Sequence, residues 1–345
     1  MSRIFRNIRK KFLRENRFTR YLVYALGEIA LVVIGILIAL YLNNLNSEKQ
    51  AEKENQRLIS DLEKGLVSNQ FLLERFTNRI YTQDSIIALL IDNKLNEESF
   101  VRNRTLNDLM SINTQYSWLK DENILTILQK ERDFSPKYNA LFALIKNFKS
   151  RLDDLENTVD ELNQLSSWND KIMAESFEWF SGNTKADQTQ KIEYILNDSF
   201  YKNRLALYRK EFNSQISHIT ALVSIRAAIM GEIQRLNNNS PDDWGSFFES
   251  LGLIPMIEIP CNSDQVDGER NFSGLNFYLI FNNTPQDIVL YRLREYLDVW
   301  EEYFIPAESF EILPQIPGRG FMLGDPDKCQ KLFITPKTGF LVVEE

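Results

Sequence analysis

The sequence predicts a mainly α-helical protein with a C-terminal all-β domain, built from a single transmembrane helix, an antiparallel helical bundle and a small β-sandwich. An unbroken apolar segment, helical spacing of apolar residues, and a late concentration of proline and glycine predict this fold class. The predicted parts are a basic cytoplasmic tail (1–20), a transmembrane helix (21–42), an extracytoplasmic helical bundle (43–238) and a β-sandwich-like domain (239–345).

The segment 21–42 reads YLVYALGEIALVVIGILIALYL and contains one charged residue, Glu28. A run of about 20 apolar residues matches the hydrocarbon thickness of a bilayer when it is helical. A cleaved signal peptide is the alternative. However, its apolar region usually has only about 7–15 residues, and its cleavage site needs small residues where this chain has Tyr41. We therefore predict a retained signal anchor.

The flanks of this segment predict its orientation. Residues 1–20 contain eight Lys or Arg residues and one acid, Glu15, which gives a net charge of +7. Short basic segments beside a membrane span stay in the cytoplasm. The whole chain has a net charge of -8, so the large part after the span is strongly acidic and is expected on the opposite side.

The first 50 residues resemble a family of Gram-negative bacterial proteins. The resemblance rests on Gly27-Glu28-Ile29, on the run from Leu31 to Leu40, and on Asn43-Asn44-Leu45-Asn46. Members combine a basic tail, such a span and a helical domain outside the inner membrane, and no activity is attached to them. The resemblance implies a bacterial inner-membrane protein with most of its chain in the periplasm.

Three apolar seams follow the span and predict long helices, which favours an antiparallel bundle. The first seam contains two polar residues, Asn69 and Gln83, which would also suit a coiled coil with a second copy of the chain. Shorter helices are expected in 103–131 and 169–197, with a break near 181–183. The seams are Ile59, Leu62, Leu66, Asn69, Leu73, Phe76, Ile80, Gln83, Ile87 and Leu90; Leu141, Ile145, Phe148, Leu152, Leu155, Val159 and Leu162; and Phe212, Ile216, Ile219, Val223, Arg226, Met230 and Ile233.

The composition changes near residue 240, because nine of the ten prolines and eight of the thirteen glycines follow it. Turn signals separate short runs rich in β-branched and aromatic residues, which predicts a small all-β domain. Residues 293–303 fit a strand pair or a short helix. The expected strands are 277–281, 288–292, 310–313, 321–323 and 332–335.

Residues 277–325 resemble the von Hippel-Lindau β-domain. The resemblance rests on the FxNxTPxxIVLY start, on the Ile305-Pro306-Ala307-Glu308-Ser309 turn, and on the segment from Pro317 to Leu323. It implies a β-sandwich that recognises proteins. Hydroxyproline readers of that family place a histidine and a tryptophan where this chain has Arg319 and Phe321, so the ligand does not carry over. The candidate binding surface comprises Trp300, Tyr303, Arg319 and Phe321.

The sequence shows no recognisable catalytic motif, metal site or cofactor site, so we predict a protein that is not an enzyme. Its one histidine, His218, lies between two apolar residues of a predicted helix and is expected to be structural. The last 105 residues contain 18 acids and 7 bases, which argues against nucleic-acid binding. Glu301 and Glu302 beside aromatic residues leave a carboxylate-dependent hydrolase of envelope glycans as the alternative.

Cys261 and Cys329 are the only cysteines, and both lie in the part expected outside the cytoplasm. An oxidising compartment permits them to form a disulfide, which we predict. Two buried thiols are the alternative.

The span itself is expected to contact another helix. Gly27, Gly35 and Ala39 are small residues spaced by multiples of four, and Glu28 needs compensation within the bilayer. The alternative is that Glu28 points back toward the cytoplasmic interface or stays protonated. Besides lipid, the expected partner is therefore another membrane protein or a second copy of the chain. The favoured function is a membrane-anchored envelope protein that presents an interaction or sensing module, and a second alternative is an accessory subunit of a membrane complex.

Overall fold

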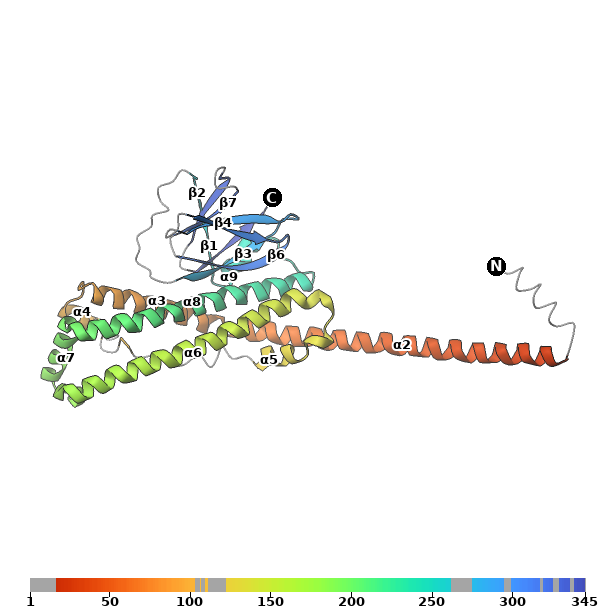
Figure 1. Cartoon of the computed structure of the whole chain (residues 1–345), viewed down its shortest axis with the longest axis horizontal. Coiled ribbons are helices and arrows are strands. Elements are labelled where there is room, and N and C mark those ends of the chain that lie inside the picture. The colour runs from red at the N-terminus through yellow and green to blue at the C-terminus, as the bar shows by residue number, and fades with distance from the viewer. Residues whose placement is uncertain are drawn as a thin grey trace. The chain divides into compact units, whose positions relative to one another are not determined.

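The computed structural model describes residues 17–102, 106, 109–110, 122–261, 275–294, 299–316, 319–324, 329–335 and 338–344. The chain divides into two compact units, Met1–Leu58 and Ile59–Glu345. The described part is mainly α-helical and ends in a β region of two sheets, as the sequence predicts (Figure 1).

In the first unit, residues 17–58 form the greater part of helix α2 (Arg17–Ser68). Every side chain described between Tyr21 and Leu42 is exposed. Two described helices are long and apolar enough to cross a membrane, α8 (Ser199–Leu236) and the segment Tyr24–Ser68 of α2. They differ in burial, because the apolar window is 89% buried in α8 and 0% buried in α2.

The first predicted bundle helix is interrupted at Asn69, where α2 ends and α3 (Gln70–Ile91) begins. Arg226 on α8 donates from Nε to the carbonyl oxygen of Leu66 at 3.0 Å and from Nη2 to Oε1 of Gln70 at 3.3 Å. In an unbroken helix that carbonyl would accept from the N–H of Gln70. A side chain inserted into the helical ladder bends a helix, so the expectation of one continuous helix was wrong at Asn69.

The other two seams are buried throughout, in α6 (Asn139–Ser176) and in α8. A 3₁₀ turn at Pro136–Tyr138 precedes α6. A second 3₁₀ turn, Glu178–Ser181, ends where the break near 181–183 was expected. Gln83 in the first seam donates to the carbonyl oxygen of Leu109 at 2.8 Å, which satisfies its amide without a second chain. Most of 103–121 lies outside the described residues. The remaining helices are α4 (Glu97–Arg102), α5 (Glu122–Gln129), α7 (Lys185–Asn197) and α9 (Trp244–Ser250), and a 3₁₀ turn covers Glu131–Asp133.

All five expected strands are present, and the ambiguous segment 293–303 contributes to β5. The short helix α9 was not expected. One sheet has the order β1 (Ile254–Pro255), β9 (Gly339–Val343), β3 (Asn276–Asn282) and β6 (Ser309–Gln315). The other has the order β2 (Ile257–Ile259), β8 (Lys331–Ile334), β7 (Gly320–Leu323), β4 (Ile288–Arg294) and β5 (Val299–Ile305).

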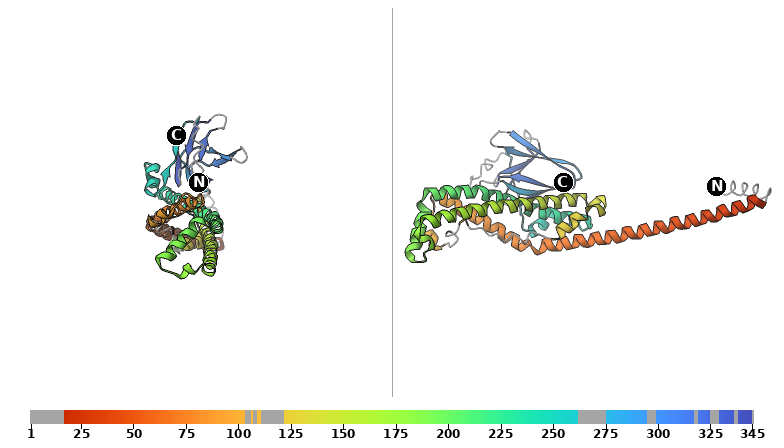
Figure 2. Two further views of the ribbon diagram at one scale, coloured as in Figure 1. Left: turned by 90° about the vertical axis from the view of Figure 1, so that its left-hand side faces the viewer. Right: turned by 60° about the horizontal axis from the view of Figure 1, so that its bottom comes forward.

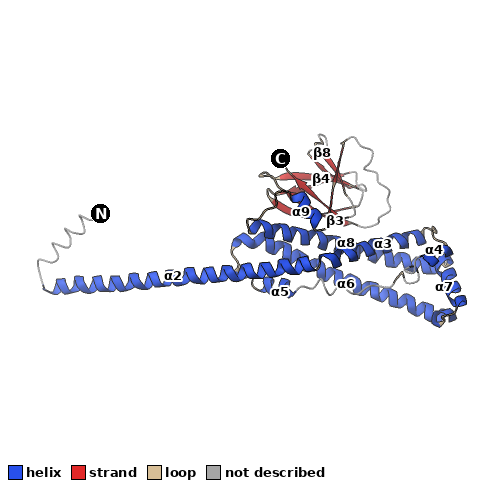
Figure 3. Ribbon diagram, turned by 180° about the vertical axis from the view of Figure 1, so that it is seen from behind, coloured by secondary structure: helices blue, strands red, loops and turns tan. Residues whose placement is uncertain are grey.

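The two sheets share one hydrophobic core, to which Tyr278 and Leu341 contribute from the first sheet and Leu290 and Phe333 from the second. Figures 1 and 2 show the sheets on one side of the helices, and Figure 3 shows α6 and α8 side by side beneath them. The other face of the first sheet packs against α8, mainly through β3. At Gly231 this packing is so close that an added Cβ would lie 2.8 Å from the ring of Phe310.

Cys261 and Cys329 form a disulfide with a Cα–Cα distance of 6.1 Å. Cys261 follows β2 and Cys329 precedes β8, and these strands pair antiparallel from Ile257↔Ile334 to Ile259↔Leu332. The disulfide therefore links β2 and β8 at the end of their ladder, where the two strands would otherwise diverge.

Replacing both cysteines by serine should lower the free energy of unfolding by roughly 4 kcal/mol, because the bond closes a long loop in the unfolded chain. Urea unfolding of the full chain in detergent, followed by circular dichroism, measures this change. A reducing agent should lower the stability of the natural chain and leave the double variant unaffected. Equal stability of the two proteins under oxidising conditions would contradict the assignment.

Candidate functional site

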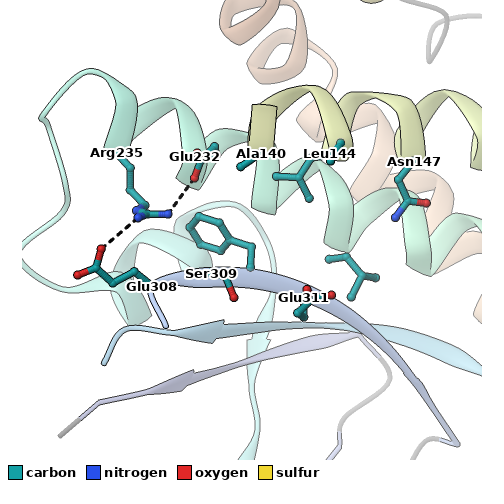
Figure 4. A pocket seen from close by; sticks show the side chains of 11 residues that line it. Ala140, Leu144, Asn147, Glu232, Arg235, Glu308, Ser309 and Glu311 are labelled. Atoms are coloured by element: carbon teal, nitrogen blue, oxygen red, sulfur yellow. Dashed lines mark hydrogen bonds and ion pairs between the residues drawn. The ribbon is translucent and has the colours of Figure 1, made fainter. Parts of the chain in front are cut away.

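A groove of about 330 Å³ lies where α6, α8 and β6 meet, and we call it the α6–β6 groove (Figure 4). Alanine and leucine side chains of α6 form one wall, and the start of β6 forms the opposite wall. Its volume is at the lower end of the range found for ligand pockets. The groove is lined by Ala140, Ala143, Leu144, Asn147, Glu232, Arg235, Glu308, Ser309, Phe310, Glu311 and Ile312.

Arg235 binds two carboxylates at one end of this groove. Its Nη1 donates to Glu232 Oε2 at 3.1 Å, and its Nη2 donates to Glu308 Oε2 at 3.4 Å (Figure 4). Its guanidinium lies 6.0 Å from the centre of the Phe310 ring. Burial raises the pKa of Glu232, and the adjacent Arg235 opposes that shift. Arg235 therefore connects α8 to β6, and its charge is already shared between two acids.

Glu311 is the exception among these charged groups. It is half-buried, and burial raises the pKa of its carboxyl group. Within the described part of the chain no cation or hydrogen-bond donor contacts the carboxylate. With all its groups ionised, the groove contains three carboxylates and one guanidinium. Such a site favours a cationic ligand over an anionic one.

The structure does not assemble the predicted β-domain surface. Phe321 is 0% exposed and lies in the hydrophobic core that the two sheets share, so its proposed role in a surface was wrong. Tyr303 packs against the same core and donates to Glu301 at 2.9 Å. The N–H of Arg319 closes a turn by donating to the carbonyl oxygen of Ile316 at 3.0 Å, and its own carbonyl accepts from Thr335 N at 2.8 Å beside the β7–β8 ladder. Trp300 lies on β5, opposite Leu293.

The remaining residues singled out in the sequence lie on helices α2 and α8. Gly27, Glu28, Gly35 and Ala39 lie in the α2 helix of the first unit, and nothing lies within 4 Å of a Cβ added at either glycine. His218 is half-buried on α8, and burial lowers the pKa of its imidazole. Among the described residues, no group of three or more His, Cys, Asp or Glu side chains is arranged to hold a metal ion.

Sequence patterns gave no sign of the α6–β6 groove. Glu232, Arg235 and Glu311 are separated by up to 79 residues and belong to elements of different type. Glu308 was noted only as part of the turn in the von Hippel-Lindau resemblance. The one available signal was the Ala140, Ala143 and Asn147 face of α6, where small residues replace the long polar side chains expected on an exposed helix.

Comparison with known proteins finds no matching family model, no matching curated protein and no matching solved structure.

Replacing Glu311 by Gln should raise the free energy of unfolding at pH 7 by up to about 1 kcal/mol, because an unpaired half-buried carboxylate is costly. The folded-state pKa of Glu311 is raised, so its charged form destabilises the fold above that pKa. The gain should shrink as the pH falls through the raised folded-state pKa, and it should vanish below the ordinary pKa of 4.5, where the carboxyl is protonated in both the folded and the unfolded state. Thermal unfolding of the full chain between pH 4 and pH 7 measures this difference.

Glu302→Gln is the matched control, since Glu302 is an exposed carboxylate on β5 and its change should have little effect on stability. A loss of stability in Glu311→Gln at pH 7 would show that the carboxylate has a stabilising partner.

Proposed function

We propose that this chain is a membrane-anchored envelope protein of a Gram-negative bacterium and that it presents the Ile59–Glu345 unit outside the cytoplasm as an interaction module. The supporting observation is the exposed apolar surface of α2 from Tyr21 to Leu42. A soluble protein seldom leaves so large an apolar surface uncovered. The +7 charge of the preceding 20 residues supports a cytoplasmic N-terminus, and the Cys261–Cys329 bond supports an oxidising compartment for the remainder.

The α6–β6 groove supports recognition as the role of this unit. It is an open groove with an apolar wall, a few convergent polar groups and carboxyls of raised pKa, which together are typical of binding sites. Lipid and a protein partner are the contacts that this function requires, and neither a cofactor nor nucleic acid enters the proposal.

Protease protection tests the orientation. Protease added to spheroplasts should digest a tag placed after Glu345, whereas a tag placed before Met1 should be digested only after lysis. The protein should remain with the membrane in alkaline carbonate, and a variant lacking Tyr21–Leu42 should be released. Protection of the C-terminal tag in spheroplasts, or release of the natural chain by carbonate, would exclude this function.

We further propose that the span associates laterally through Gly27, Gly35 and Ala39, with Glu28 hydrogen-bonded across the contact. Gly35→Leu should reduce crosslinking in native membranes by blocking close approach, and Glu28→Gln should reduce it by removing the charge. Ile36→Leu keeps the volume on a neighbouring helix position and serves as the control. Equal crosslinking of the natural chain and all three variants would show that this surface contacts only lipid.

A further inference from the structure

Strand β6 has hydrogen-bonding capacity that no other strand of the described residues uses. It is the last strand of its sheet, whose order is β1-β9-β3-β6, so β3 is its one neighbour among the described strands. The pairing covers all seven residues of β6, from Ser309 opposite Asn282 to Gln315 opposite Asn276. The other side of β6 is therefore an exposed row of backbone groups unless other elements cover it.

The contacts of Phe277 show which groups of β6 face outward. Its N–H donates to Thr220 Oγ1 at 3.1 Å and its carbonyl accepts from Ser224 Oγ at 2.9 Å, so it makes no ladder bond to its opposite residue, Pro314. Bonded and non-bonded pairs alternate in an antiparallel ladder. Phe310 and Ile312 thus also direct their N–H and carbonyl groups away from β3.

Pro314 and its neighbour Arg292 limit the open part of this edge. Pro314 has no N–H, and its carbonyl accepts from Nη1 of Arg292 at 2.6 Å. The outward groups of Phe310 and Ile312 have no hydrogen-bond partner in the described part of the chain. The available edge is therefore the first half of β6, and this is the half that lines the α6–β6 groove.

The groove provides room beside that edge. Ala140, Ala143 and Asn147 of α6 are exposed and Leu144 is half-buried, so short side chains lie across from β6 (Figure 4). An added strand would lie about 4.8 Å from β6, with alternate side chains directed toward this wall of α6. The unpaired groups on β6 require an extended polypeptide as the occupant, because only a backbone supplies donors and acceptors at that spacing.

Charge determines the kind of polypeptide. No cation of the described residues lies beside Glu311, and the single guanidinium that lines the groove is shared by Glu232 and Glu308. A second copy of this edge would bring its own Glu308 and Glu311 close to these carboxylates, and like charges on neighbouring strands are unfavourable. A segment with a basic side chain would instead supply the missing cation.

We propose that the outer edge of β6 binds an extended segment of a partner protein as an added strand, and that a Lys or Arg side chain of this segment pairs with Glu311. This inference rests on the proposed interaction function and names its site and the class of its ligand. The backbone of Phe310 and Ile312 provides the hydrogen bonds, and α6 provides the apolar wall.

The test uses the full chain in nanodiscs of zwitterionic lipid and a fluorescent heptapeptide of alternating valine and lysine. Saturable binding is expected. Ile312→Pro removes one outward N–H without removing a bond to β3, and it should weaken binding about tenfold. Glu311→Gln should weaken it by a similar factor. Glu302→Gln, on the edge strand of the other sheet, is the matched control and should bind as the natural chain does.

Two further peptides separate the contribution of the backbone hydrogen bonds from that of the charge. A peptide N-methylated at alternate residues cannot form the ladder, and a valine–glutamate peptide has the wrong charge, so neither should bind measurably. Equal binding of either peptide, undiminished binding to Ile312→Pro, or no saturable binding of the lysine peptide would overturn the proposal. These outcomes are independent of the protease-protection result, which tests the membrane orientation.

If Ile312→Pro does not fold, a benzophenone placed at the centre of the lysine peptide replaces it as the test. Crosslinks to α6 between Ala140 and Asn147 are expected. Crosslinks confined to β5 or to other surfaces would place the peptide elsewhere and overturn the assignment of the site.

Discussion

The enclosure of α8 constrains every other part of the Ile59–Glu345 unit. Each residue from Ile219 to Ile233 is buried, so this stretch of the helix has no solvent-facing side. The helices α3 and α6 and the strands β3 and β6 of the first sheet are its main neighbours. A helix that is apolar all round needs partners on all sides, and here helices alone do not suffice. The sheet is therefore part of the core of the helical region, and the bundle is incomplete without it.

Polar contacts determine how these layers fit together. Arg226, which is buried in α8, donates to the backbone where α2 and α3 meet, and burial lowers the pKa of its guanidinium to about 10. On the opposite side, Thr220 and Ser224 bond to the backbone of Phe277. Asn276 also donates to the hydroxyl of Tyr81 at 2.6 Å, which connects β3 to α3. Because unpaired buried groups are costly, these bonds select one position of the sheet on the helices.

The sequence predicts those features that depend on local periodicity. Apolar spacing predicts α6 and α8, and alternation with turn residues predicts the principal strands. Features that depend on distant residues are missed. The break at Asn69 is caused by Arg226, a residue 157 positions later, and Arg226 itself occupies an apolar seam position. Phe321 was assigned to a surface by resemblance, whereas its place in β7 directs it into the core. The α6–β6 groove could not be predicted from the sequence for the same reason, since residues of three separate elements form it.

The enclosure of α8 also explains why the edge of β6 stays available. The sheet must lie flat on α8 to cover it, and Gly231 permits Phe310 to approach the helix closely. This arrangement places the outer edge of β6 beside α6, where no strand of the described residues pairs with it and the α6–β6 groove remains open. Edge strands in stable proteins are usually blocked by charge, proline or a covering element. Here Pro314 blocks one half, and the carboxylates of Glu308 and Glu311 oppose pairing with an identical edge. The open first half of the β6 edge therefore favours a basic strand over an acidic one. A recognition edge needs such selectivity, whereas an edge with a purely structural role has no use for it.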